Sequence, residues 1–217
     1  MKSFRCKIAG YFNLRFMPQR GQITENTEIG RWIFLLSSLD EVMNIVEIGT
    51  WNGKGSSLQI ARAVVQRKVR PLRVVGLETD QTLARKAARN LRKYKFFEVM
   101  HDRIIEDSEL DAEGLIGDEN QWFLQDQLNL FSCPNVLKNL PDAIDLLILD
   151  GGTFSTFTEF LKLQDRVTKW IVLDDTNTRK CHRVLREVSE SNVFTVLHRS
   201  HERNGIAIIK RSAVNTK

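Results

Sequence analysis

Residues 46–57 have the sequence VEIGTWNGKGSS, and this stretch decides the fold. Its first residues belong to Asn44–Ile48 (NIVEI), an apolar, β-branched run of the kind found in strands that are covered on both faces. Its last residues open Ser56–Val69, where apolar side chains recur at helical spacing. The three glycines between them allow a tight turn and a close approach of a ligand to the backbone. A buried strand, a glycine-rich turn and a helix therefore begin a ligand-binding α/β sheet.

The rest of the chain repeats this alternation. We expect further strands at Leu72–Leu77, Phe96–Met100, Ile144–Leu149, Trp170–Leu173, Val193–His198 and Gly205–Lys210, and helices at Gln81–Tyr94, Glu119–Phe131, Ser155–Gln164 and Thr178–Ser189. Strands without polar alternation, joined by helices, predict a parallel sheet with helices on both faces. The fold class is thus α/β, a Rossmann-like doubly wound sheet of seven strands. Asn-Gly between the last two runs predicts a hairpin, which adds an antiparallel strand at the edge.

Charge divides the chain into an arm and a body. The chain has 217 residues and a net charge of +5. Residues 1–20 contain five basic side chains and no acidic one, so the remaining chain is neutral. We interpret residues 1–25 as a basic, aromatic arm or lid, and residues 26–217 as a single domain. The connection 102–140 is acidic, with nine carboxylates and one arginine up to residue 126, and it is a candidate element on the substrate side.

Several classes of protein do not fit this composition. No apolar run approaches the length of about 20 residues that spans a bilayer. The basic N-terminus lacks the apolar stretch and cleavage site of a secretory signal. Three cysteines, far apart and without a CxxC pair, support neither a disulfide framework nor a zinc cluster. A reducing, cytoplasmic location fits best, and the neutral body disfavours a long groove for nucleic acid.

The glycine spacing and its preceding acid indicate the ligand. The pattern GxxxGxG differs from the GxGxxG of dinucleotide folds and cannot be fitted to a P-loop. Glu47, two residues before the first glycine, would repel a phosphate and attract an ammonium group. Glu78 follows the second strand, where a carboxylate can accept both hydroxyls of a ribose. The alternative is that Glu78 or Asp80 caps the next helix.

Three more carboxylates follow the fourth and fifth strands. Asp150 ends the first of these runs, and Asp174 and Asp175 end the second. Neighbouring carboxylates repel one another unless a proton or a cation lies between them. Oxygen ligands without Cys or His suit Mg²⁺, Mn²⁺ or Ca²⁺. The sequence therefore predicts a divalent metal at Asp150, Asp174 and Asp175, with a helix cap as the alternative for the last two.

Taken together, VEIGTWNGKGSS, GLETD, LLILDGG and VLDDTN resemble the class I S-adenosylmethionine-dependent methyltransferases over about residues 40–211. The aspartates resemble those of the metal-dependent small-molecule O-methyltransferases of the catechol and macrocin types. The resemblance implies S-adenosylmethionine as cofactor and Mg²⁺ or Mn²⁺ as metal, held by Asp150, Asp174 and Asp175. It implies cofactor contacts, including one to adenine from Asp102, at the positions Glu47, Gly49, Trp51, Gly53, Glu78, Asp102 and Asp150.

The general base is the weakest part of the match. In the catechol type a lysine follows three residues after the first metal aspartate, and here that position is Thr153. Asp175 stands where that type has asparagine, which is nearer the macrocin type with its sugar substrates. Asp150 and His101 are the two candidate catalytic residues, although a surface or structural role is the favoured alternative for His101.

The sequence thus predicts a metal-dependent O-methyltransferase for a small molecule such as a sugar or a diol. A metal chelating two neighbouring hydroxyls would orient them and lower the pKa of one. Alternatives are a nucleic-acid or protein methyltransferase, a non-catalytic cofactor-binding module and, least supported, an NAD-dependent oxidoreductase. No NPPY-like tetrapeptide follows the fourth strand, which disfavours methylation of a base amine. We expect no membrane partner, and the arm could dock over the site or on a second subunit of a homodimer.

Overall fold

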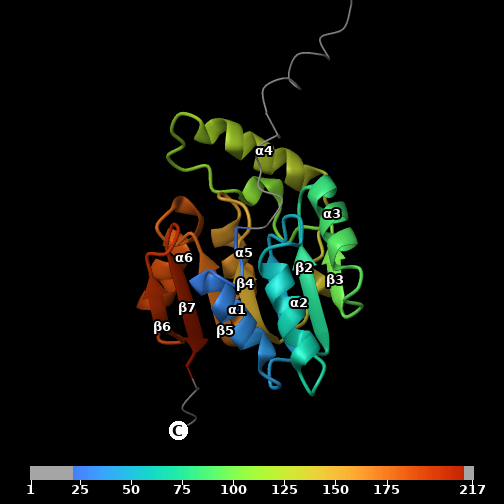
Figure 1. The fold of residues 1–217 in the computed structure, drawn as a ribbon. Coiled ribbons are helices and arrows are strands. Elements are labelled where there is room, and N and C mark those ends of the chain that lie inside the picture. Colours follow the sequence, from blue (N-terminus) through green and yellow to red (C-terminus); the bar gives the residue numbers. More distant parts are fainter. Residues whose placement is uncertain (1–21, 213–217) are drawn as a thin grey trace, which may run out of the picture.

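A seven-stranded sheet is the centre of the computed structural model, which describes residues 22–212 (Figure 1). Its strands are β1 (Asn44–Ile48), β2 (Arg73–Leu77), β3 (Phe97–Met100), β4 (Ile144–Leu149), β5 (Val167–Asp174), β6 (Phe194–Ser200) and β7 (Ile206–Arg211). Their spatial order is β3-β2-β1-β4-β5-β7-β6. Strands β1 to β5 pair in parallel, and β7 pairs antiparallel with both β5 and β6. The predicted fold class is therefore confirmed.

The C-terminal hairpin differs from the prediction in one respect. The antiparallel strand is present, but it is not at the edge: β7 lies between β5 and β6. All four apolar residues Ile206–Ile209 are buried, whereas β6 alternates between exposed positions and positions that are buried or half-buried. A strand that is apolar on both faces stabilises the sheet more from an interior position, and the half-polar strand is left at the edge.

Two apolar cores lie on opposite faces of the sheet. Helices α1 (Glu28–Ser38), α2 (Ser56–Gln66) and α3 (Gln81–Leu91) pack on one face, against side chains such as Ile45, Leu146 and Val172. Helices α5 (Thr156–Leu163) and α6 (Arg179–Glu190) pack on the other, against the alternate side chains, such as Val46, Leu147 and Ile171. Because successive residues of a strand point to opposite faces, unbroken apolar runs are needed to fill both cores.

Helix α1 was not predicted from the sequence. Thr27 caps it by accepting a hydrogen bond from the backbone N–H of Gly30. Ile29, Ile33 and Leu36 are buried at the spacing of one helix face, and α1 packs closely against α2. The pattern is helical, but it is short and lies beside the arm, where we had assigned no element.

The predicted helices and strands are otherwise present with small shifts at their ends. The helix predicted as Ser56–Val69 ends at Gln66, because Arg67 turns to an extended backbone and donates to the carbonyl oxygens of Val42 and Asp40. Short 3₁₀ turns, Asp107–Glu109, Leu137–Asn139 and Gln164–Arg166, occur in the connections. Within residues 22–212, no helix is long and apolar enough to span a membrane.

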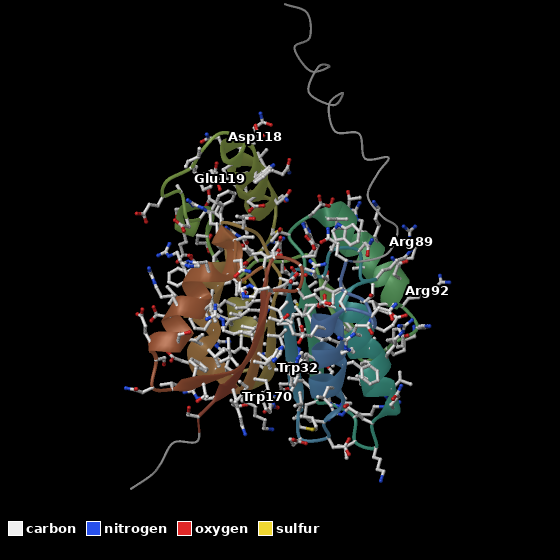
Figure 2. The ribbon with its side chains drawn as sticks, turned by 60° about the vertical axis from the view of Figure 1, so that its left-hand side comes forward. Trp32, Arg89, Arg92, Asp118, Glu119 and Trp170 are labelled. Atoms are coloured by element: carbon white, nitrogen blue, oxygen red, sulfur yellow. The ribbon has the colours of Figure 1, made fainter. Side chains whose placement is uncertain are left out.

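The sheet order creates the place for a ligand. The chain moves from β1 outward to β2 and β3, then returns to β4 on the other side of β1. At such a reversal the loops beyond the carboxyl ends of the strands separate and leave a crevice. Helix α4 (Glu119–Phe131) lies across this end of the molecule (Figure 1). Figure 2 shows Asp118 and Glu119 there, and Trp32 and Trp170 toward the opposite end of the sheet.

Candidate active site

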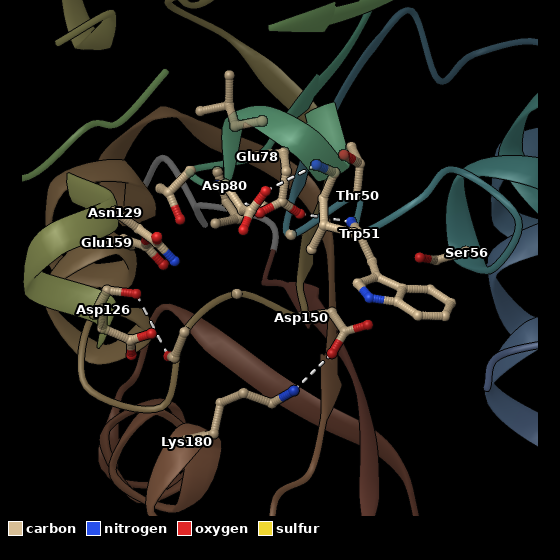
Figure 3. A pocket seen from close by; sticks show the side chains of 18 of the residues that line it. Thr50, Trp51, Ser56, Glu78, Asp80, Asp126, Asn129, Asp150, Glu159 and Lys180 are labelled. Atoms are coloured by element: carbon tan, nitrogen blue, oxygen red, sulfur yellow. Dashed lines mark hydrogen bonds and ion pairs between the residues drawn. The ribbon is translucent and has the colours of Figure 1, made fainter. Parts of the chain in front are cut away.

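A cavity of about 430 Å³ lies beyond the carboxyl ends of β1 to β5 (Figure 3). Its walls come from the glycine turn after β1, from Glu78–Asp80 after β2, from Asp102–Ile104 after β3 and from the loops after β4 and β5. Helix α4 contributes Asp126, Asn129 and Leu130. The volume is within the range of about 300–1,000 Å³ that is usual for small-ligand sites. This crevice is where the strand order predicts a ligand.

The glycine turn after β1 is held close to the neighbouring strands. The backbone N–H groups of Gly49 and Thr50 both donate to the carbonyl oxygen of Leu77, at 2.9 and 3.1 Å. Gly49 has a φ of +88°, and a Cβ there would lie 2.1 Å from the backbone oxygen of Asp150. Gly49 and Trp51 line the cavity, whereas Gly53 packs against Ala87 of α3, outside the lining. The turn thus exposes its backbone to the cavity at Gly49, and at Gly53 it packs against α3.

Glu78 faces the cavity from the end of β2. Its Oε2 accepts from the backbone N–H of Trp51 at 2.7 Å, and its Oε1 accepts from that of Asp80 at 3.0 Å. Burial raises the pKa of Glu78 to about 7. The capping role belongs to Asp80, whose side chain accepts from the N–H of Leu83. Each oxygen of Glu78 keeps a second lone pair, so it can still accept a hydroxyl of a ligand.

Glu47 lies behind the glycine turn rather than in the cavity lining. Its side chain is fully buried, and Oε2 accepts from the hydroxyl of Ser57 at 2.6 Å. Burial raises the pKa of Glu47 to about 8, and Oε1 has no partner among the described residues. Residues of β1 alternate between the faces, so Glu47 points toward α2 while Ile48 lines the cavity. Its predicted contact with the cofactor stays a prediction.

Asp102 lines the cavity at the end of β3, where the resemblance places an adenine contact. Burial raises its pKa above the usual value. His101, one residue earlier, is not in the lining. Its Nε2 lies 3.0 Å from the carbonyl oxygen of Thr79 and 3.2 Å from Sγ of Cys133. This placement is that of a structural histidine and leaves Asp150 as the better placed of the two candidate bases.

The three predicted metal ligands do converge. Asp150, Asp174 and Asp175 each offer an oxygen, and these atoms lie within 4.8 Å of one another. None of them caps the next helix, because the cap of α6 is Thr178. Burial and the charge of Asp150 raise the pKa of Asp174 to about 6. Burial also raises the pKa of Asp175, but the Lys180 ammonium, a hydrogen bond from Asn204 and the charge of Arg203 together lower it by more, and the result is below the usual value.

Two basic side chains already pair with these carboxylates. Nζ of Lys180 lies 2.6 Å from Oδ1 of Asp150 and 2.7 Å from Oδ2 of Asp175. Nη2 of Arg203 lies 2.9 Å from Oδ2 of Asp174. A divalent ion bonds carboxylate oxygen at about 2.0–2.6 Å, so it would need the space that the ammonium fills. As arranged, these residues do not fit a divalent metal.

Lys180 and Arg203 were missed in the sequence, although Lys180 carries a signal. Lys180 is the second residue of α6, where the helix dipole disfavours a positive charge. A lysine at this position indicates a compensating partner elsewhere. Arg203 has a φ of +57°, and the other described non-glycine residues with positive φ are Trp51 and Asp175. All three line the cavity, as expected where backbone strain is retained at a functional site.

Asp126 and Glu159 are two further carboxyl groups that the sequence did not single out. Glu159 of α5 is 3% exposed, lines the cavity and has an Oε2 without a partner among the described residues. Burial raises the pKa of Glu159 to about 8 and that of Asp126 to about 6. Figure 3 shows both on the opposite side of the cavity from Trp51. They extend the acidic lining toward α4.

Comparisons with known proteins identify the fold. No protein-family model matches the sequence, and no curated protein does either. An O-methyltransferase from Bacillus cereus, solved in complex with SAH, is similar at a TM-score of 0.59 and 17% identity, over 90% of this chain and 84% of that one. A methyltransferase from Geobacter sulfurreducens gives 0.57 and 18%, over 88% and 82%. An rRNA methylase from Streptococcus thermophilus gives 0.54 and 16%, over 88% and 99%. The chain has the fold of the class I methyltransferases, as the sequence predicted.

Proposed function

We propose that this protein is an S-adenosylmethionine-dependent methyltransferase that methylates a hydroxyl oxygen of a small molecule, such as a sugar or a diol. The observation that carries the proposal is the cavity at the switch in strand order, with Glu78 and Asp102 at the ends of β2 and β3. In this arrangement Glu78 receives the ribose hydroxyls, Asp102 lies beside the adenine and the glycine turn holds the methionine part. The same fold in a SAH complex of an O-methyltransferase supports this assignment.

The acidic lining favours a small molecule over a nucleic acid. Among the described residues that line the cavity, seven side chains are carboxylic and three are basic. A cleft with an excess of carboxylates repels phosphates, whereas it tolerates neutral hydroxyls and attracts cations. The rRNA methylase of the same fold keeps the nucleic-acid alternative in view. The neutral body of this chain argues against it, because nucleic-acid binding depends on many phosphate contacts.

Asp150 is the residue we assign to the proton. The acceptor oxygen attacks the methyl carbon in line with the sulfur, the carbon–sulfur bond breaks, and sulfur keeps the electron pair as S-adenosylhomocysteine forms. The hydroxyl proton passes to a carboxylate oxygen of Asp150. Lys180 holds Oδ1 of Asp150 at 2.6 Å, which fixes the carboxylate and leaves Oδ2 for the acceptor. Alignment of the two reactants supplies a large share of the rate, about 7–11 kcal/mol in well-oriented reactions.

Other parts of the sequence-based interpretation stay predictions. The divalent metal does not fit the residues as arranged, and the proposed methyl transfer does not use one. Residues 1–21 of the arm lie outside the described residues, although Gln22 and Ile23, which follow them, line the cavity. The acidic connection 102–140 lies at the cavity through Asp126, Asn129 and Leu130. A homodimer and a cytoplasmic location are likewise untested.

Calorimetric titration with S-adenosylhomocysteine tests the cofactor assignment. We expect micromolar binding to the wild type and binding weaker by about tenfold or more in Glu78→Gln, which loses one carboxylate oxygen. Glu98→Gln is the matched control, because Glu98 lies exposed on β3 and pairs with Arg73. No binding to the wild type would refute the assignment.

The acceptor is tested by following S-adenosylhomocysteine release with sugars, diols, RNA and protein as substrates. Turnover on a sugar or diol supports the proposal. Turnover only on RNA or protein would show that the acceptor is a macromolecule and not a small molecule. Cofactor binding without any turnover would favour a non-catalytic binding module.

A further inference from the structure

We infer that the ammonium of Lys180 takes the place of a divalent cation in this site, and that the protein binds its cofactor and acceptor without a metal. The inference rests on the proposed function and deepens it. It starts from the convergence of Asp150, Asp174 and Asp175 at the ends of β4 and β5. Such a cluster needs a compensating charge, and the structure supplies that charge from the chain itself.

The geometry makes the ammonium and a metal ion mutually exclusive. Nζ of Lys180 is 2.6 Å from Asp150 and 2.7 Å from Asp175, and it bridges two strands that are neighbours in the sheet. An ion bonded to the same two oxygens would lie about 2.0–2.6 Å from each, which is almost the position of Nζ. Figure 3 shows Lys180 reaching Asp150 from α6. The ammonium and an ion bonded to these two oxygens would therefore compete for the same position.

The two basic side chains bring the same positive charge to the carboxylate cluster as a divalent metal ion would. Three carboxylates carry −3, and Lys180 with Arg203 brings +2, which is the charge of one divalent cation. Arg203 forms an ion pair with Asp174 at 2.9 Å, and Lys180 forms ion pairs with Asp150 and Asp175. The site thus has the balance of a metal–tricarboxylate centre, built entirely from side chains.

Local energetics show that Lys180 is held by this cluster and not by its helix. The residue is 8% exposed, and burial of a lone ammonium is strongly unfavourable. Position two of α6 adds the repulsion of the helix N-terminus. The short contacts to Asp150 and Asp175 offset both costs, because a buried ion pair with good geometry recovers much of its desolvation.

The placement also gives Lys180 a role toward the acceptor. An ammonium has three N–H donors, and Asp150 and Asp175 accept two of them. Lys180 lines the cavity, so its remaining N–H can donate to the acceptor oxygen. That hydrogen bond would orient the hydroxyl beside Asp150 and stabilise the charge that develops as the proton leaves.

Binding of Mn²⁺ alone, measured from the electron paramagnetic resonance signal of the free ion, tests the inference. We expect no site-bound Mn²⁺ in the wild type at millimolar concentration. In Lys180→Gln the carboxylates lose their ammonium, and Mn²⁺ affinity should rise by about tenfold or more. Lys162→Gln is the matched control, since Lys162 of α5 pairs with Glu109 away from the cluster. Lys180→Met, which has a similar shape but no charge, serves if Lys180→Gln does not fold, and the same gain in Mn²⁺ affinity is expected of it.

Several results would overturn the inference. Wild-type Mn²⁺ binding that is lost in Asp175→Asn would show a true metal site. A folded Lys180→Gln without any gain in Mn²⁺ affinity would show that the lysine does not stand in for a cation. S-adenosylhomocysteine affinity that EDTA lowers in the wild type would contradict metal independence. Failure of S-adenosylhomocysteine to bind at all refutes the proposed function instead, and the Mn²⁺ comparison still decides the role of Lys180.

Discussion

Glu159 is a buried carboxyl group whose ionisation opposes folding, and Glu159→Gln should reveal this as a pH-dependent gain in stability. Burial raises the pKa of Glu159 from 4.5 to about 8. The folded protein therefore keeps the proton over a range in which the unfolded chain releases it. Stability from this group is highest below pH 4.5, falls as the pH rises toward 8 and is constant above that value.

The magnitude follows from the pKa difference. Each pH unit between the two pKa values changes the free energy of unfolding by about 1.4 kcal/mol. At pH 7 the wild type has lost about 3 kcal/mol relative to a group that does not titrate. The glutamine amide leaves a buried N–H to satisfy, at a cost of about 1–3 kcal/mol that does not depend on pH. The informative quantity is thus the change with pH of the difference between variant and wild type.

Urea unfolding at pH 5 and pH 7 measures that change. We expect the free energy of unfolding of Glu159→Gln, relative to the wild type, to rise by about 2–3 kcal/mol between the two pH values. The corresponding shift in melting temperature is about 4–10 °C. Glu187→Gln, at an exposed position of α6, gives the matched baseline. An equal difference at both pH values would refute the reasoning, because it would mean that Glu159 is ionised in the folded protein.

Three further predictions concern the turn, the arm and α6. Gly49→Ala should lower the free energy of unfolding by about 2 kcal/mol or more in urea, since the added Cβ would lie 2.1 Å from the backbone oxygen of Asp150 at a φ of +88°; an unchanged midpoint would contradict this. Removal of residues 1–21 should weaken acceptor affinity in steady-state kinetics, because Gln22, the residue that follows them, lines the cavity; full affinity and an unchanged mass in light scattering would refute the arm as a lid or dimer contact. Thr178→Ala should cost about 1 kcal/mol by loss of the α6 cap, measured by thermal unfolding; a cost near zero would show that α6 does not depend on this cap.

Local pattern was sufficient for most of the fold. Strand β4 is buried at all six positions and apolar at all but Asp145, and the sequence predicts it with the bounds that the structure has. Helix α1 escaped prediction although Ile29, Ile33 and Leu36 have helical spacing, because this apolar run is short and lies beside the arm. The place of β7 inside the sheet is a property of pairing between distant segments, which a hairpin signal alone does not reveal.

The sequence likewise predicts the positions of the site residues but not their roles. Carboxylates at strand ends are visible in the sequence, because a residue that follows an apolar run must lie at the edge of the sheet. Their roles are not visible there. Asp80 and Thr178 take the caps, which leaves Glu78 and Asp175 to the cavity, and Glu47 turns to the other face.

The amino-acid pattern alone predicts a doubly wound sheet with acidic strand ends around a glycine turn. The groups that balance those acids become apparent only in the folded chain. Lys180 lies 30 residues from Asp150 in the chain yet 2.6 Å from it in space. Burial and ion pairing depend on which segments the fold brings together, so the same aspartates that predict a metal in the sequence hold a lysine in the folded chain.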